Sequence, residues 1–170
     1  MKTIYGNIKS PAKKQYTEEV GLTASQVFPA KSGRWVVRGS TGAFSAASGA
    51  SDEALIGTID FVGTASATAK ATKTAIQIEP TVSVEMPIYE AGAVGGEVTQ
   101  AEVDAAYGTI CGLKVVSNVQ YADIDNTTAN QCVLMIMGGD AEENTLYCIK
   151  NPTFEAVSGG TALVEAVDVI

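Results

Sequence analysis

Histidine is absent from this 170-residue chain. Because histidine is the usual general base and the commonest metal ligand in proteins, its absence excludes Ser-His and Cys-His nucleophile pairs. The glycine clusters do not have the spacing of a phosphate-binding loop or of a dinucleotide-binding fingerprint. The sequence therefore predicts no catalytic residues, no cofactor and no metal, and it favours a binding or structural role.

Long apolar runs and cysteine pairs are also missing. No stretch of about 18 apolar residues is present, which excludes a membrane-spanning helix, and Lys2 is followed by polar residues, unlike a secretory leader. The three cysteines, Cys111, Cys132 and Cys148, have no C-x-x-C spacing and lie in apolar, strand-like runs. We expect buried free thiols in a reducing compartment, not disulfides or nucleophiles.

The charge is distributed unevenly. Residues 1–38 contain seven bases and two acids, whereas the remainder contains four bases and seventeen acids, so that the chain has a net charge of −8. An acidic body repels phosphate and argues against nucleic acid as a partner. A basic N-terminal segment is able to bind an acidic neighbouring surface, although a solvated tail explains the same charge pattern.

Short runs of β-branched and apolar residues alternate with turn signals along the chain. The run at 131–137 is almost entirely apolar and predicts a central strand buried on both faces, followed by a loop at 138–144. The fold class predicted is mainly β, as a small β-sandwich or β-barrel. The strands are expected at 33–39, 43–46, 58–62, 74–80, 84–92, 97–100, 109–116, 119–125, 131–137, 145–150 and 161–170.

One short motif occurs twice. An acidic residue and an alanine precede Gly-Thr-Ile at Gly57 and again at Gly108. We interpret this as a duplicated unit of strand, turn, strand, helical turn and strand, at about 33–62 and 84–116, although a match at so few positions also fits chance. Both glycines are then expected to end a helical turn in the left-handed conformation. Thr99 and Glu102 have the spacing of a capping box.

A few other side chains are candidates for individual roles. Asp123, Asp125 and Asn126 carry oxygens suited to calcium, but the spacing lacks the EF-hand glycine and terminal glutamate, so a turn with Asx hydrogen bonds is favoured. The lone Trp35 is expected to be a core or interface anchor. The carboxylates at 140–143 are expected in a solvated loop.

The pattern resembles a known family in several stretches: WVVRG at 35–39, AFSAA at 43–47, EALIG at 53–57 with AAYG at 105–108 as a second form, MPIYEAG at 86–92 and GEVTQA at 96–101. Over residues 26–137 the chain is similar to the capsid decoration, or cement, proteins of tailed bacteriophages. The resemblance implies a virion structural protein, without enzymatic activity, that binds the outer surface of an assembled capsid. It implies the major capsid protein as partner, neighbouring copies as further partners, head stabilisation as the role, and assembly in the host cytoplasm.

Two alternatives remain open: another virion component, such as a tail-tube or head-fibre base protein, and a β-barrel enzyme or small-ligand binder, which would need a polar pocket. Residues 1–25 show no periodicity and are expected to form an extended arm on a β-rich body at 26–170. The arm is expected to contact the capsid or a neighbouring subunit, with no role for membranes or nucleic acid. The residues expected to make this contact are Ile4, Tyr5, Ile8, Lys9, Lys13, Lys14 and Tyr16.

Overall fold

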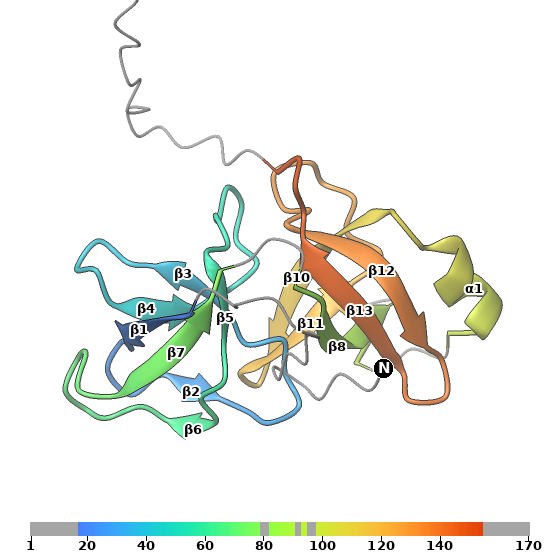
Figure 1. Ribbon diagram of the computed structural model, residues 1–170. Helices are drawn as coiled ribbons and strands as arrows, with labels where there is room; N and C mark the ends of the chain where they lie inside the picture. Colours follow the sequence, from blue (N-terminus) through green and yellow to red (C-terminus); the bar gives the residue numbers. More distant parts are fainter. Residues whose placement is uncertain (1–16, 79–81, 91–92, 95–97, 155–170) are drawn as a thin grey trace, which may run out of the picture.

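The computed structural model describes residues 17–78, 82–90, 93–94 and 98–154. These residues form thirteen strands and one short helix, which confirms the predicted mainly β fold. The strands are arranged in two lobes that lie side by side (Figure 1): lobe 1 comprises residues 17–78 and lobe 2 residues 82–154. The strand expected at 161–170 lies outside the described residues.

Lobe 1 is a five-stranded sheet whose order is β1-β7-β5-β3-β4. A parallel bridge between Leu22, just after β1, and Phe44 of β4 joins the two ends of the sheet into a ring. The lobe contains β1 (Thr17–Gly21), β3 (Trp35–Arg38), β4 (Phe44–Ala46), β5 (Gly57–Ile59) and β7 (Lys73–Gln77), with a separate small pair of β2 (Val27–Phe28) and β6 (Gly63–Thr64).

Lobe 2 is a second ring, of order β11-β10-β12-β13-β8, which a parallel pairing of β11 with β8 closes. The short strand β9 pairs with β8, and the helix α1 lies against β12. The lobe contains β8 (Val84–Glu90), β9 (Ala93–Val94), α1 (Gln100–Ala105), β10 (Ile110–Val116), β11 (Val119–Asp123), β12 (Leu134–Asp140) and β13 (Thr145–Lys150).

The two rings have the same topology. In each ring the first strand pairs antiparallel with the fifth, and the first strand or the residue directly after it pairs parallel with the third. The fourth strand lies between the second and the fifth. The strands β1, β3, β4, β5 and β7 therefore correspond to β8, β10, β11, β12 and β13. The repeated topology thus spans about 17–77 and 84–150, not the predicted 33–62 and 84–116.

The predicted equivalence of Gly57 with Gly108 is wrong. Gly57 begins β5, and its φ is not positive, whereas Gly108 follows α1 with a φ of +78°. A side chain at Gly57 would place its Cβ 2.1 Å from the backbone oxygen of Gln77, so a close approach of two strands requires this glycine. The helical turn expected before Gly57 is only a turn at residues 51–52, because no run of helical hydrogen bonds follows.

Several predicted boundaries are corrected. Residues 17–21 are not part of an arm: they form β1, which pairs with all of β7. The strand expected at 97–100 is corrected at its end, because Thr99 is the N-cap of α1 and Gln100 is its first residue. The capping box forms: the Thr99 amide donates to the Glu102 carboxylate at 2.7 Å, and the Thr99 hydroxyl accepts from the Glu102 amide at 3.3 Å. The loop expected at 138–144 starts later, because β12 continues through a bulge to Asp140.

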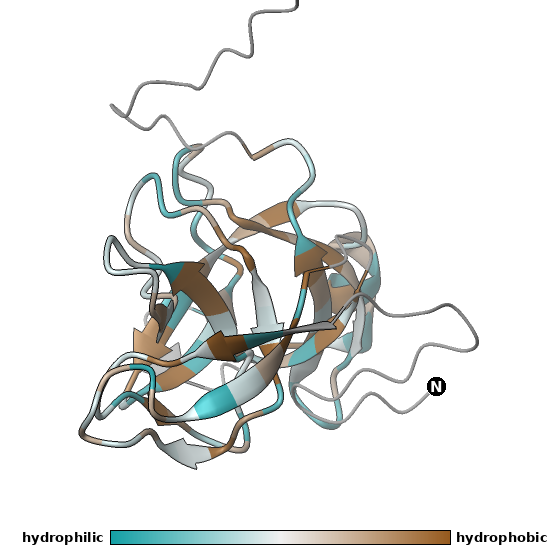
Figure 2. Ribbon diagram, turned by 60° about the vertical axis from the view of Figure 1, so that its left-hand side comes forward, coloured by the Kyte–Doolittle hydropathy of each residue, from teal (hydrophilic) through white to brown (hydrophobic). Residues whose placement is uncertain are grey.

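The lobes are joined through a shared apolar core. Trp35, Ala47 and Leu55 of lobe 1 belong to the hydrophobic cluster of lobe 2, and lobe 1 has a second cluster around Phe28. Trp35 is 3% exposed, which confirms the expected anchor, and its indole N–H donates to the Met86 sulfur at 3.2 Å. In Figure 2, hydrophobic residues, coloured brown, lie on strands of both lobes.

Candidate interaction surface

Three adjacent strands of lobe 2 present apolar side chains on their outer side. Along β12 the residues alternate, with Leu134 and Ile136 buried and Met135 and Met137 half-buried. Met135 pairs with Ile110 of β10 on one side and with Ile149 of β13 on the other. The register therefore places a row of three apolar side chains across the outside of the ring.

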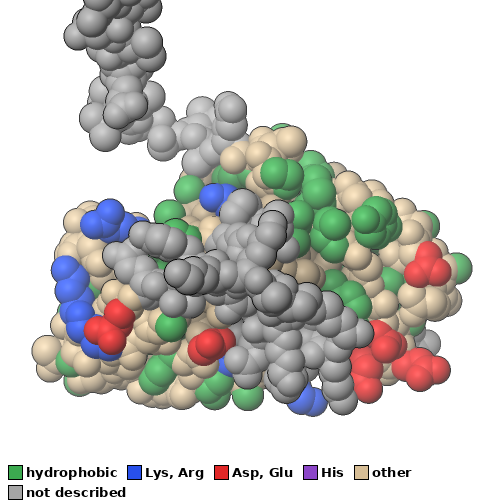
Figure 3. All heavy atoms as spheres, in the orientation of Figure 1, with side chains coloured by type: hydrophobic (Ala, Val, Ile, Leu, Met, Phe, Trp, Pro, Cys, Tyr) green, Lys and Arg blue, Asp and Glu red, His purple; other side chains and the backbone are tan. Residues whose placement is uncertain are grey.

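Neighbouring residues extend this row. Ile110 is 40% exposed and Tyr107 is 63% exposed, and the loop between them is held to β12 by hydrogen bonds between Gly108 and Thr109 and the backbone of Ile136. We name this surface the outer face; it consists of Tyr107, Ile110, Met135, Met137, Tyr147 and Ile149. In Figure 3, hydrophobic side chains gather over lobe 2 at upper right.

Carboxylates border the outer face. Burial raises the pKa of the Tyr147 phenol above its ordinary value, and the negative charges of Glu85, Asp140 and Glu143 raise it further. Glu85 lies opposite Tyr147 on β8 and accepts a hydrogen bond from the Thr145 hydroxyl at 3.2 Å. The outer face is therefore apolar at its centre and acidic at one side.

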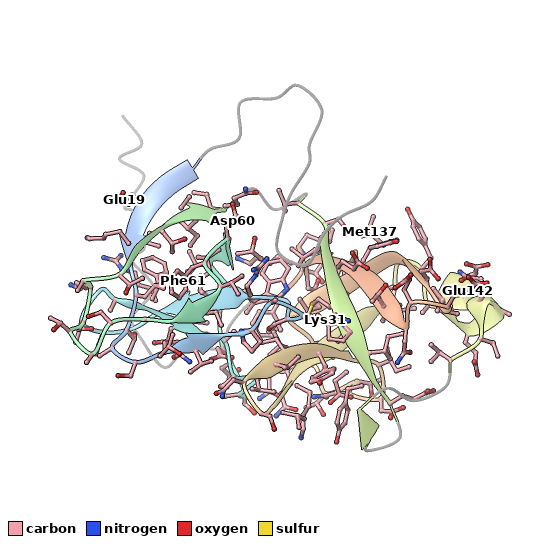
Figure 4. All side chains as sticks on the ribbon, turned by 90° about the horizontal axis from the view of Figure 1, so that it is seen from below. Glu19, Lys31, Asp60, Phe61, Met137 and Glu142 are labelled. Atoms are coloured by element: carbon pink, nitrogen blue, oxygen red, sulfur yellow. The ribbon has the colours of Figure 1, made fainter. Side chains whose placement is uncertain are left out.

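The acidity belongs to lobe 2 as a whole. Residues 82–154 contain two bases and ten acids, a net charge of −8, whereas residues 17–78 contain five of each. Acidic side chains gather at the lower right end of lobe 2 in Figure 3, and Figure 4 places Glu142 at the end of the molecule far from Glu19 of lobe 1. A partner of the outer face thus meets a negative field.

The prediction that β12 is buried on both faces is wrong. The strand is central, because it pairs with β10 and β13, but only one of its sides faces the interior of the ring. Met135 and Met137 lie on the other side, where no layer of the described residues fully covers them. The all-apolar run at 131–137 was a signal for this surface, but the sequence alone does not show which side the core occupies.

The residues considered for chemistry have structural roles. The three cysteines are free and buried, as expected. The pKa of the Cys111 thiol is raised mainly by a hydrogen bond with Cys148 and further by burial, and burial also raises the pKa of the Cys132 thiol. Both thiols are therefore poor nucleophiles. Among the described residues no group of His, Cys, Asp and Glu is arranged to hold a metal ion.

The possible calcium ligands form a turn. The Asn126 side-chain oxygen accepts from the Thr128 amide at 3.0 Å, and its amide group donates to Gln131 at 2.9 Å. This is the Asx hydrogen bonding that the sequence favours. Asp140 is used similarly, because it accepts from the Glu142 and Glu143 amides.

A pocket beneath α1 does not provide a ligand site. It is lined mainly by apolar side chains, including Ile88, Val103 and Leu146, and has room for little more than a water molecule. Within the described part of the chain, no helix is long and apolar enough to cross a bilayer. The residues expected to contact a capsid or subunit, which lie between Ile4 and Tyr16, are outside the described residues.

No protein-family model, curated protein sequence or solved structure matches the chain.

Proposed function

We propose that the chain is a virion structural protein that binds the outer surface of an assembled phage capsid and stabilises it. The observation that carries the proposal is the outer face: a row of half-exposed apolar side chains on a rigid sheet, which is typical of a surface that binds another protein. The sequence resemblance to capsid decoration proteins supplies the identity of the partner, the major capsid protein.

The architecture suits this role. Two rings that share a core form one stiff body, and the outer face is built on paired strands instead of loops, so that docking costs little conformational entropy. The cysteines are buried, and the side chains of Asn126 and Asp140 accept hydrogen bonds from the backbone of their own loops. Stabilisation would follow from mass action, because a protein that binds the assembled shell and not its dissociated subunits favours the shell.

The test is co-sedimentation of the purified chain with empty and with full capsids of the phage that encodes it, followed by heating of the loaded capsids. We expect saturable binding and a higher temperature of capsid disruption. The alternative, a tail-tube or head-fibre base protein, predicts instead that the chain forms rings by itself and does not sediment with capsids.

A further inference from the structure

We propose that residues 1–16, the basic N-terminal segment, lie across the outer face of lobe 2 of the same chain. The outer face is apolar at its centre and has carboxylates beside it, so a segment that covers it in the free protein needs apolar side chains and positive charge. Three parts of this protein are available: the N-terminal segment, the C-terminal segment at 155–170, and the outer face of a second copy.

Charge separates these three. Residues 1–16 contain four bases and no acid, whereas residues 155–170 contain three acids and no base. The C-terminal segment would therefore meet carboxylates of its own sign beside Tyr147. Two outer faces packed together would oppose the same carboxylates. Only the N-terminal segment complements the surface.

The segment also has the apolar residues that such a surface requires. Exposed ion pairs contribute little each, so lysines alone would not hold the segment in place. Ile4, Tyr5, Ile8 and Tyr16 are distributed along it. These apolar side chains are able to pack against the row of Ile110, Met135 and Ile149 at the centre of the outer face.

The point of attachment allows this contact. Thr17, the first residue of β1, pairs with Gln77 at the end of β7, and only residues 78–83 separate β7 from β8 of lobe 2. The segment thus begins near the junction of the lobes. Fully extended, its sixteen residues reach about 50 Å, whereas a compact lobe of about 65 residues has a radius of gyration of about 11 Å.

Tethering favours the same chain over a second copy. A segment tethered within reach of its site has an effective concentration of about millimolar, far above that of the dilute protein. This inference goes beyond the proposed function and does not depend on it. It assigns the expected contact residues of the arm to lobe 2 of their own chain, and it means that any partner of the outer face displaces the segment.

The methionines provide a direct test. The chain has four: Met1 in the segment, Met135 and Met137 on the outer face, and Met86, which is 0% exposed in the core. With methyl-labelled methionine, we expect the Met135 and Met137 signals to differ between the full chain and a chain lacking residues 1–16. The Met86 signal should stay in place and serve as the control for an unchanged fold.

A synthetic peptide of residues 1–16, added to the truncated chain, should return the Met135 and Met137 signals to their positions in the full chain. A peptide with Lys9, Lys13 and Lys14 replaced by Glu should bind about tenfold more weakly at low salt. Identical signals in the two chains, or equal binding of a 155–170 peptide, would overturn the proposal. Sedimentation of the full chain as a dimer and of the truncated chain as a monomer would overturn it in favour of a second copy. No capsid is present, so these results are independent of the proposed function.

Discussion

The side chain of Gln120 in lobe 2 is hydrogen-bonded in both directions to the backbone of Trp35 in lobe 1. The Trp35 amide donates to Gln120 Oε1 at 2.6 Å, and Gln120 Nε2 donates to the Trp35 carbonyl at 2.8 Å and to the Ala47 carbonyl at 2.8 Å. Gln120 is 1% exposed. A single buried amide therefore satisfies three backbone groups of the other lobe, and it fixes the two rings as one body.

Replacing Gln120 with Ala should destabilise the whole protein. The Trp35 amide and the Ala47 carbonyl would lose this partner, whereas the Trp35 carbonyl keeps its hydrogen bond from the Ala47 amide. Since a buried group left without a partner costs about 1–3 kcal/mol, we expect a loss of about 2 kcal/mol or more in the free energy of unfolding. Chemical denaturation measures this loss. Gln26→Ala, which removes a side-chain amide that has no hydrogen bond to the described residues, is the matched control and should change it by less than about 1 kcal/mol. Equal effects of the two substitutions would show that the lobes are not coupled through Gln120.

The two glycines of the repeated motif should respond to alanine for different reasons. Gly57→Ala drives a Cβ into the Gln77 carbonyl, which is backbone and unable to move aside, and should cost about 3 kcal/mol. Gly108→Ala meets nothing within 4 Å but must adopt a φ of +78°, and should cost about 1 kcal/mol. Thermal unfolding of both variants measures the order; a larger loss for Gly108→Ala would contradict this account.

The stability of the first turn of α1 should depend on pH. Hydrogen bonds from the backbone N–H and then the hydroxyl of Thr99 lower the pKa of Glu102. Because the pKa is lower in the folded than in the unfolded state, the stabilisation is present above the ordinary carboxyl range and is lost as the pH falls through the lowered pKa. The Thr99 amide signal should shift over that acidic range in NMR spectra. In Glu102→Gln, which keeps an acceptor without a charge, the signal should not titrate; a titration there would assign the shift to another group.

Much of the fold could be predicted from local signals. The hairpin of β3 and β4, the strands β8, β10 and β13, and the capping box of α1 follow from alternating apolar residues, turn residues and the Thr-x-x-Glu spacing, all of which act over a few residues. The expected burial of Trp35 and of the cysteines follows from their apolar surroundings.

What the sequence did not show depends on long-range pairing. β1 looks like an irregular arm because its sequence, TEEVG, is polar, and it becomes a strand by pairing with β7, about 55 residues later. The Gly-Thr-Ile motif predicts the wrong correspondence between the two halves, because the structure repeats an order of strands and not that motif. The outer face could not be predicted, because an apolar strand has the same sequence pattern whether the core or a partner covers its second side.

The central claim, that the outer face is a surface for binding the capsid, is tested most directly by one comparison. Ile110 on the outer face is 40% exposed, and Val62 in lobe 1 is 50% exposed, so Ile110→Glu and Val62→Glu place the same charge at two exposed apolar positions. Capsid co-sedimentation of both variants, with circular dichroism to confirm folding, separates a contact from a general effect of charge. We predict that Ile110→Glu weakens binding at least about tenfold, since a buried charge at an interface is costly, and that Val62→Glu binds like the unmodified chain. Full binding by a folded Ile110→Glu protein would contradict the account.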